Sequence, residues 1–160
     1  MHARVNEFRS RFEALTNEAP RIEELPEGTH TASDAAKAVG CQLEQIAKSM
    51  VMDVDGELVL VLTSGPNRVD ESALAHERGI DPDTVSPADP DLVKTQLGWS
   101  IGGIPPVCHD TTVETYIDPS LLEHEEVWAG GGTPQAVFAI DPTRLQELTD
   151  AESVDVFIRE

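Results

Sequence analysis

Lys48 is the side chain whose position most directly indicates chemistry. It stands where a predicted helical turn, residues 43–47, runs into the apolar stretch that begins at Met50, and the chain has only two other lysines. Burying a lysine costs several kcal/mol unless its ammonium group is paired or used. A structural alternative is a lysine that binds the last carbonyls of the helical turn, which the helix dipole favours. We favour the functional interpretation, because costly charges concentrate at functional sites.

Two glycine-rich loops could supply the backbone part of such a site. In Gly102-Gly103-Ile104-Pro105-Pro106 the glycines let a ligand approach the amides, and the prolines stiffen the loop. Rigid N–H groups aimed at one point are what an oxyanion-binding site requires. The loop Gly130-Gly131-Gly132-Thr133-Pro134 has the same character. Either loop alone could be a structural turn, but two loops and one lysine together indicate a pocket that stabilises negative charge.

Other combinations of reactive residues are weaker candidates. Cys108-His109 has the composition of a nucleophile with its base, but neighbours on an extended chain point to opposite faces. His109-Asp110 and His124-Glu125-Glu126 lack the spacing of a zinc site. The chain has neither a Walker loop nor a dinucleotide-binding fingerprint, since Gly130-Gly131-Gly132 leads into a predicted strand. We therefore expect no metal ion and no cofactor.

Hydrophobic spacing and capping residues predict the helices that surround these loops. Val5, Phe8, Phe12 and Leu15 recur at helical spacing, in a helix that ends before Pro20. Thr31 is a predicted N-cap, with Asp34 three residues further on, for a short helix that stops at Gly40. Further helices are predicted over residues 69–78, 87–97 and 143–148.

The predicted strands form a sheet without regular helical crossovers. Residues 49–54 and 57–63 are expected to pair as a hairpin around Asp55-Gly56. Shorter strands are predicted over residues 113–117, 125–129 and 136–140. Because strands outnumber helices and do not alternate with them, we expect an α+β fold with a mixed, mostly antiparallel, partly closed sheet. We expect one domain over residues 1–160, with residues 1–29 as an N-terminal helical extension.

The charge of the chain is strongly negative, at −19. Acidic residues are spread over the whole length rather than gathered in a tail, which favours a salt-adapted surface over an acidic tail or a disordered chain. In roughly molar salt the screening length falls to about 3 Å, so such a surface is tolerated. There is no apolar stretch long enough for a membrane span and no signal-peptide pattern, so we expect a cytoplasmic protein with its cysteines reduced.

Several segments, taken in order, resemble the YbaK / prolyl-tRNA synthetase-associated editing domain family. The resemblance extends over about residues 30–157. The segments are Thr31-Ala32-Ser33-Asp34-Ala35-Ala36, Gln45-Ile46-Ala47-Lys48-Ser49, Leu60-Val61-Leu62-Thr63-Ser64-Gly65, Asn67-Arg68-Val69-Asp70, Gly102-Gly103-Ile104-Pro105-Pro106 and Trp128-Ala129-Gly130.

The resemblance implies an aminoacyl-tRNA deacylase that acts in trans, on a curved mixed sheet surrounded by helices. The family's essential lysine corresponds to Lys48, and its Gly-x-x-x-Pro loop to residues 102–106. We assign catalysis to Lys48, Gly102 and Gly103, without a metal ion or a covalent nucleophile. The residues assigned to substrate binding are Ser64, Asn67, Arg68, Ile104, Pro105, Pro106, Cys108, His109, Gly130, Gly131 and Gln135. Members of the family commonly carry glycine at the position of Cys108 and histidine at that of Gln135.

The expected substrate is a small aminoacyl group of the alanine, cysteine or serine class on the acceptor end of tRNA. Transfer RNA for proline and prolyl-tRNA synthetase are the candidate partners. The charge opposes binding of a polyanion, so a local patch of Arg68, Lys48 and Arg4-Arg9-Arg11 would have to contact the tRNA. The alternatives are a non-catalytic module that binds tRNA or a protein, and a hydrolase of another acyl ester. The oligomeric state stays open.

Overall fold

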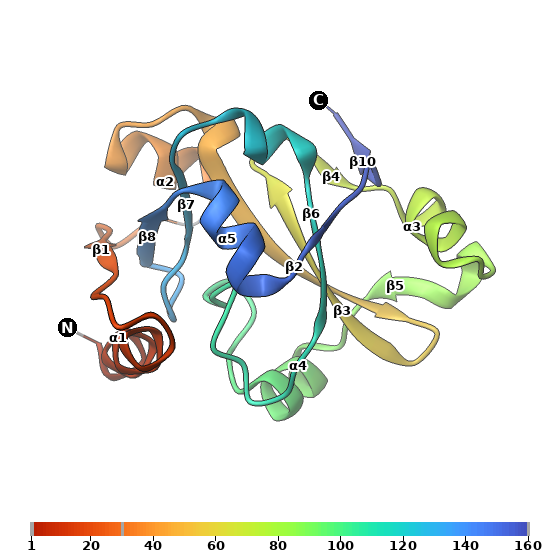
Figure 1. Cartoon of the computed structure of the whole chain (residues 1–160), viewed down its shortest axis with the longest axis horizontal. Helices are drawn as coiled ribbons and strands as arrows, with labels where there is room; N and C mark the ends of the chain where they lie inside the picture. The colour runs from red at the N-terminus through yellow and green to blue at the C-terminus, as the bar shows by residue number, and fades with distance from the viewer. Residues whose placement is uncertain (1, 30, 160) are drawn as a thin grey trace.

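A long hairpin forms the middle of the molecule (Figure 1). In this computed structural model, which describes residues 2–29 and 31–159, strands β2 (Ile46–Val54) and β3 (Glu57–Ser64) pair antiparallel along their whole length. Asp55 and Gly56 between them both have positive φ angles, 52° and 88°. Two such residues form the turn type that matches the twist of paired strands. The predicted hairpin is confirmed.

The other strands extend this hairpin into a mixed sheet, which confirms the predicted fold class. The order is β1-β8-β7-β2-β3-β6-β9, and β5 pairs with β2 as well. The β2–β7, β3–β6 and β6–β9 pairs are parallel, whereas β1–β8, β7–β8 and β2–β5 are antiparallel. A small second sheet pairs β10 with β4. The bounds are β1 Arg21–Glu24, β4 Arg68–Val69, β5 Val85–Pro87, β6 Glu114–Ile117, β7 Val127–Gly130, β8 Ala136–Ile140, β9 Glu152–Ser153 and β10 Phe157–Ile158.

Helices surround the sheet, and capping residues set where they begin and end. Thr31 accepts a hydrogen bond from the Asp34 N–H, and Gly40 ends that helix in the left-handed conformation, as predicted. Several other helices start at an Asp-Pro pair, where the aspartate caps the helix and proline fixes the first φ angle. The α-helices are α1 Ala3–Thr16, α2 Ala32–Val39, α3 Glu71–Arg78, α4 Pro90–Leu97 and α5 Pro142–Thr149, and the 3₁₀ turns are η1 Leu43–Gln45, η2 Pro82–Thr84 and η3 Pro119–Glu123.

Three predicted helix boundaries were wrong because residues expected to be helical pair in a strand instead. The turn predicted over residues 43–47 ends at Gln45, because Ile46 and Ala47 already pair with β7. Helix α3 begins two residues later than predicted, since β4 takes up residues 68–69. Helix α4 likewise begins after β5. In each case pairing with a strand distant in sequence overrides a local helical preference.

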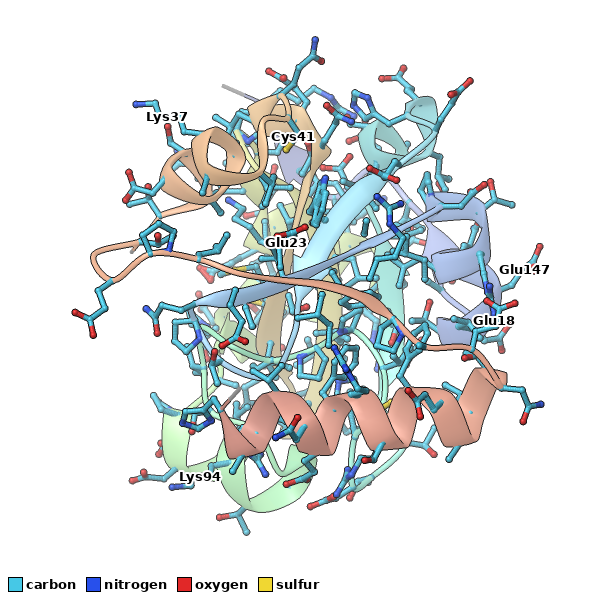
Figure 2. The ribbon with its side chains drawn as sticks, turned by 90° about the vertical axis from the view of Figure 1, so that its left-hand side faces the viewer. Glu18, Glu23, Lys37, Cys41, Lys94 and Glu147 are labelled. Carbon is cyan, nitrogen blue, oxygen red and sulfur yellow. The ribbon has the colours of Figure 1, made fainter. Side chains whose placement is uncertain are left out.

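Helix α1 packs on the sheet through its aromatic side chains. Phe8 and Phe12 are buried, and their ring centroids lie 4.9 Å and 5.5 Å from that of Phe138 in β8. Leu15, the last residue of the predicted apolar stripe, is 52% exposed. Figure 2 shows α1 lying across one end of the sheet, next to the β1 segment. None of the helices within residues 2–29 and 31–159 is long and apolar enough to cross a membrane.

Acidic side chains from different parts of the chain share one surface. Glu18, Glu23 and Glu147 lie on the face seen in Figure 2. Because a chain with a net charge of −19 repels itself when unscreened, we expect the melting temperature to rise between roughly 0.1 and 2 M KCl. A rise of about 4–8 °C would correspond to about 2 kcal/mol in a domain of this size. Circular dichroism checks it, with sucrose at matched osmolality as the control. An unchanged melting temperature would contradict a salt-adapted surface.

Candidate functional site

A cavity of about 410 Å³ opens where two strands diverge along one edge of β2. Strand β7 pairs with Ile46 and Ala47, and β5 pairs only from Met52 onward. Among the described residues, no strand pairs with residues 48–51 on that edge. The cavity occupies this gap and is closed by helix α2 and the two glycine-rich loops. Its lining includes Thr29, Thr31, Ala35, Lys48, Ser49, Met50, Ala88, Ile101, Gly102, Ile104, Trp128, Gly130, Pro134 and Ala136.

The backbone of β2 offers polar groups to the cavity. The Val51 carbonyl accepts a hydrogen bond from the Ala88 N–H at 3.0 Å, so Val51 directs its backbone groups to the open edge. Successive residues of a strand alternate in this respect, so Ser49 directs its N–H and carbonyl to the same edge. The Ser49 hydroxyl is buried without a hydrogen-bond partner in the described part of the chain. The backbone N–H and carbonyl of Ser49 are therefore directed to the edge that the cavity occupies.

Lys48 lines the same cavity from within β2, half-buried. Its ammonium group donates a hydrogen bond to the Asn67 carbonyl at 2.7 Å, in the loop that follows β3. The ammonium group thus bonds across the sheet to the β3–β4 loop. This contact fixes the position of the ammonium group relative to the β3–β4 loop.

Asp118 holds the loop that contacts Lys48. This fully buried carboxylate accepts hydrogen bonds from the Ser64 N–H at 3.1 Å and from the Asn67 side-chain amide at 2.9 Å. Its other oxygen accepts from the Ser120 N–H and caps η3. Ser64 and Asn67, predicted to bind substrate, instead lie in this buried network, and the Ser64 hydroxyl donates to the Glu44 carbonyl. The network fixes the carbonyl that accepts from Lys48.

The two glycine-rich loops meet backbone to backbone. A Cβ on Gly103 would lie 2.6 Å from Thr133 main-chain atoms, and a Cβ on Gly130 would lie 2.6 Å from the Ile104 carbonyl oxygen. The Gly132 N–H donates to the Gly103 carbonyl at 3.0 Å. Contacts below 3 Å leave no room for a side chain, so glycine is required at both positions.

Some backbone N–H groups of these loops donate to protein carbonyls, and others have no protein acceptor. The Gly103 N–H donates to the Ser100 carbonyl at 3.2 Å, and the Gly131 N–H donates to the Ala136 carbonyl at 2.8 Å. Within residues 31–159, the N–H groups of Gly102 and Ile104 have no protein acceptor. Both residues line the cavity. Gly102 and Ile104 thus line the cavity with N–H groups that no protein acceptor occupies, whereas the Gly103 N–H is already bonded.

Cys108, His109 and Pro106 lie apart from Lys48, on a second cavity of about 390 Å³. Cys108 has a φ angle of 70°, a conformation that favours glycine, the residue at this position in the family that the sequence resembles. Burial raises the pKa of its thiol to about 11, so the thiol is protonated at neutral pH. The His109 Nε2 donates to the Pro105 carbonyl at 2.7 Å, and burial lowers its pKa, so the ring is neutral. This pair is not placed to attack a ligand beside Lys48.

Three other residues that were predicted to bind substrate do not line the cavity. The Gln135 side-chain amide donates to the carbonyl of Thr29, which does line the cavity, at 3.3 Å. Arg68 is exposed in β4, opposite Ile158. Gly131 is buried in the loop behind Gly130.

Sequence reasoning missed several residues of the cavity wall. Thr29 is brought there by long-range packing, and no local signal marks it. Ala35 lies in a segment of the family resemblance and Pro134 in the second glycine-rich loop, but neither was assigned to the site. Trp128 stands next to Gly130 in a segment that the family resemblance includes, so it could have been found. Within the described residues, no group of three or more histidine, cysteine, aspartate or glutamate side chains is placed to hold a metal ion.

The comparisons with known proteins agree with the resemblance in the sequence. A family model for the aminoacyl-tRNA editing domain matches residues 26–148. The chain is 28% identical over 131 residues to an uncharacterized protein, YwhH, of Bacillus subtilis, with 80% of each covered. It is 29% identical over 127 residues to a proline–tRNA ligase of Staphylococcus saprophyticus, of which it spans only 21%.

A solved structure is similar over the whole chain. It is a protein proposed to be a trans-editing enzyme for prolyl tRNA synthetase, with a TM-score of 0.91 and 36% identity, covering 100% of this chain and 99% of that one. The family model covers well over half of the chain. The chain therefore belongs to the family of aminoacyl-tRNA editing domains, of the YbaK-like type.

Proposed function

We propose that this protein is a trans-acting deacylase that hydrolyses the ester bond between a small mischarged amino acid and tRNA. One observation carries the proposal: Lys48, Gly102 and Ile104 line one cavity, and the N–H groups of Gly102 and Ile104 have no acceptor among residues 31–159. Membership of the editing-domain family supports the same reaction. The similarity to a proline–tRNA ligase supports tRNA for proline as the substrate and prolyl-tRNA synthetase as a partner, in the cytoplasm.

The proposed reaction uses charge stabilisation rather than a nucleophilic side chain. A water molecule attacks the carbonyl carbon of the ester, and the carbonyl oxygen becomes an oxyanion. The Gly102 and Ile104 N–H groups donate to this oxyanion, and one such donor is worth about 3 kcal/mol. The bond from carbon to the ribose oxygen then breaks, and that oxygen takes up the proton that the attacking water releases. Lys48 holds the terminal phosphate or the acyl group in place.

Two of the α1 arginines in the predicted patch for tRNA, Arg4 and Arg11, are bonded within the protein. Arg4 and Arg11 each form ion pairs with Glu7, and Arg11 also pairs with Asp110. Each also donates to a carbonyl of the loop that follows α4. We therefore propose that recognition depends on the acceptor end entering the cavity, rather than on a basic surface along the tRNA duplex.

A panel of charged tRNAs tests the function and the size of the acyl pocket. Small buried side chains such as Ala35, Ala47 and Ala129 form much of the wall, so bulk is the expected basis of selection. One methylene group is worth only about 1–3 kcal/mol in such a pocket. We expect alanyl-, cysteinyl- or seryl-tRNA to be hydrolysed at least about 10-fold faster than leucyl-tRNA in high salt.

Release of the labelled amino acid from each tRNA at equal concentration gives the rates. Each tRNA without protein is the control for spontaneous hydrolysis. Equal rates for leucyl- and alanyl-tRNA would contradict selection by bulk. No hydrolysis of any aminoacyl-tRNA, with binding retained, would favour the non-catalytic module instead.

A further inference from the structure

Helix α1 contacts both ends of the loop that carries the proposed oxyanion donors. The guanidinium group of Arg4 donates to the Gly98 carbonyl, and that of Arg11 donates to the Cys108 carbonyl at 2.8 Å. These two carbonyls flank residues 99–107, which include Gly102 and Ile104. A single helix therefore binds the loop where it leaves α4 and again where it ends.

Trp99 fills the space between α1 and this loop. The side chain is fully buried, and the Arg4 guanidinium carbon lies 4.0 Å from its ring centroid. The indole N–H donates to the Cys108 carbonyl at 3.0 Å, so this carbonyl accepts from both Trp99 and Arg11. The loop is thus held at its base by hydrogen bonds and by an arginine stacked on an aromatic ring.

The second glycine-rich loop contacts the same assembly. A Cβ on Gly132 would lie 2.8 Å from the Arg4 carbonyl oxygen and 3.2 Å from Trp99. Gly132 in turn donates to the Gly103 carbonyl. One turn of α1 therefore touches both loops that wall the cavity.

Helix α1 is itself firmly anchored, and it lies outside the segment that defines the family. Phe8 and Phe12 fix it in the main core beside Phe138. The family match covers residues 26–148, whereas α1 spans Ala3–Thr16. The contacts with the loops are thus an addition to the domain that the family model describes.

We propose that α1 is a brace that sets the position of the oxyanion loop, with Arg4 and Arg11 as positioning residues. The effect on catalysis rests on the function proposed above. Displacing a catalytic group by 1 Å can cost about 100-fold in rate. Without the two guanidinium groups the loop keeps its sequence and its glycines, but it loses the charged hydrogen bonds at both ends. Its N–H groups are then no longer held at one point.

The test is the double variant Arg4→Gln/Arg11→Gln, studied by steady-state kinetics and amide hydrogen exchange. We expect kcat for deacylation to fall about 10–100-fold, with KM within about twofold of wild type. Exchange should accelerate in residues 99–107 but not in β2 and β3. The single variant Arg11→Lys keeps a charged donor at this position and leaves Arg4 intact. Its kcat should lie between those of the double variant and the wild type. The control is Arg144→Gln, which removes the α5 ion pair with Glu18 and touches neither loop.

Three outcomes would overturn the brace: unchanged kcat with unchanged exchange in residues 99–107, faster exchange throughout the protein, or the same effect in Arg144→Gln. Failure of the proposed function has a different signature. The wild-type protein would then hydrolyse no aminoacyl-tRNA, while the exchange of residues 99–107 would still show whether Arg4 and Arg11 hold the loop.

Discussion

Replacing Lys48 by alanine is expected to lower kcat/KM for deacylation at least about 100-fold while the protein stays folded. Lys48 lines the cavity, and its ammonium group donates to the Asn67 carbonyl. An alanine removes the positive charge that we propose holds the phosphate or acyl group. Stability should change little, because the side chain is only half-buried.

The matched control for this variant is Lys94→Ala. Lys94 is exposed on α4, at the surface in Figure 2, and does not line the cavity. Rates of amino acid release from the preferred aminoacyl-tRNA, with circular dichroism to verify folding, give the comparison. A folded Lys48→Ala protein with near wild-type activity would remove the lysine from the mechanism.

Asp118→Ala is expected to lower the free energy of unfolding by about 3 kcal/mol or more, and to lower activity as well. The substitution leaves three N–H donors, those of Ser64, Asn67 and Ser120, without their acceptor. Each buried donor left without a partner costs about 1–3 kcal/mol. The Asn67 carbonyl, which accepts from Lys48, also loses its support.

The variant Asp141→Ala is the control that distinguishes loss of the Asp118 hydrogen-bond network from loss of a helix cap alone. Asp141 also precedes a proline and caps a helix, but its carboxylate is exposed and bonds to the Thr143 N–H. Loss of such a cap costs about 1 kcal/mol. Urea denaturation of both variants gives the difference. Equal destabilisation, with equal activity at a temperature where both are folded, would show that Asp118 is only a cap.

Asp118 and Asp141 differ in a way that the sequence does not predict. Asp118-Pro119 and Asp141-Pro142 look alike in the sequence, and both start helices. Only the path of the chain brings Ser64 and Asn67, more than fifty residues earlier, against one of them. A buried carboxylate acceptor of this kind has no local signal.

Local signals did predict the hairpin, the helix caps and the two loops. Asp55-Gly56 and the apolar runs on both sides of it predict the β2–β3 pair from local sequence. Strand β1 was missed because three of its four residues are exposed and polar, and it exists only through pairing with β8. Whether Gly102 or Gly103 has a free N–H depends on the Ser100 carbonyl, a detail of loop geometry that residue types do not encode.

Because the proposed oxyanion donors are main-chain groups, they do not depend on which side chain a residue carries. Apart from proline, no substitution deletes the N–H of Gly102 or Ile104, so these donors can persist while the surrounding sequence diverges. The exceptions are Gly103, Gly130 and Gly132, where a single methyl group would collide with the backbone of a neighbouring segment. Substitutions in the side chains of the cavity wall could therefore change which acyl group is removed. A single glycine-to-alanine substitution at one of these three positions could abolish the reaction.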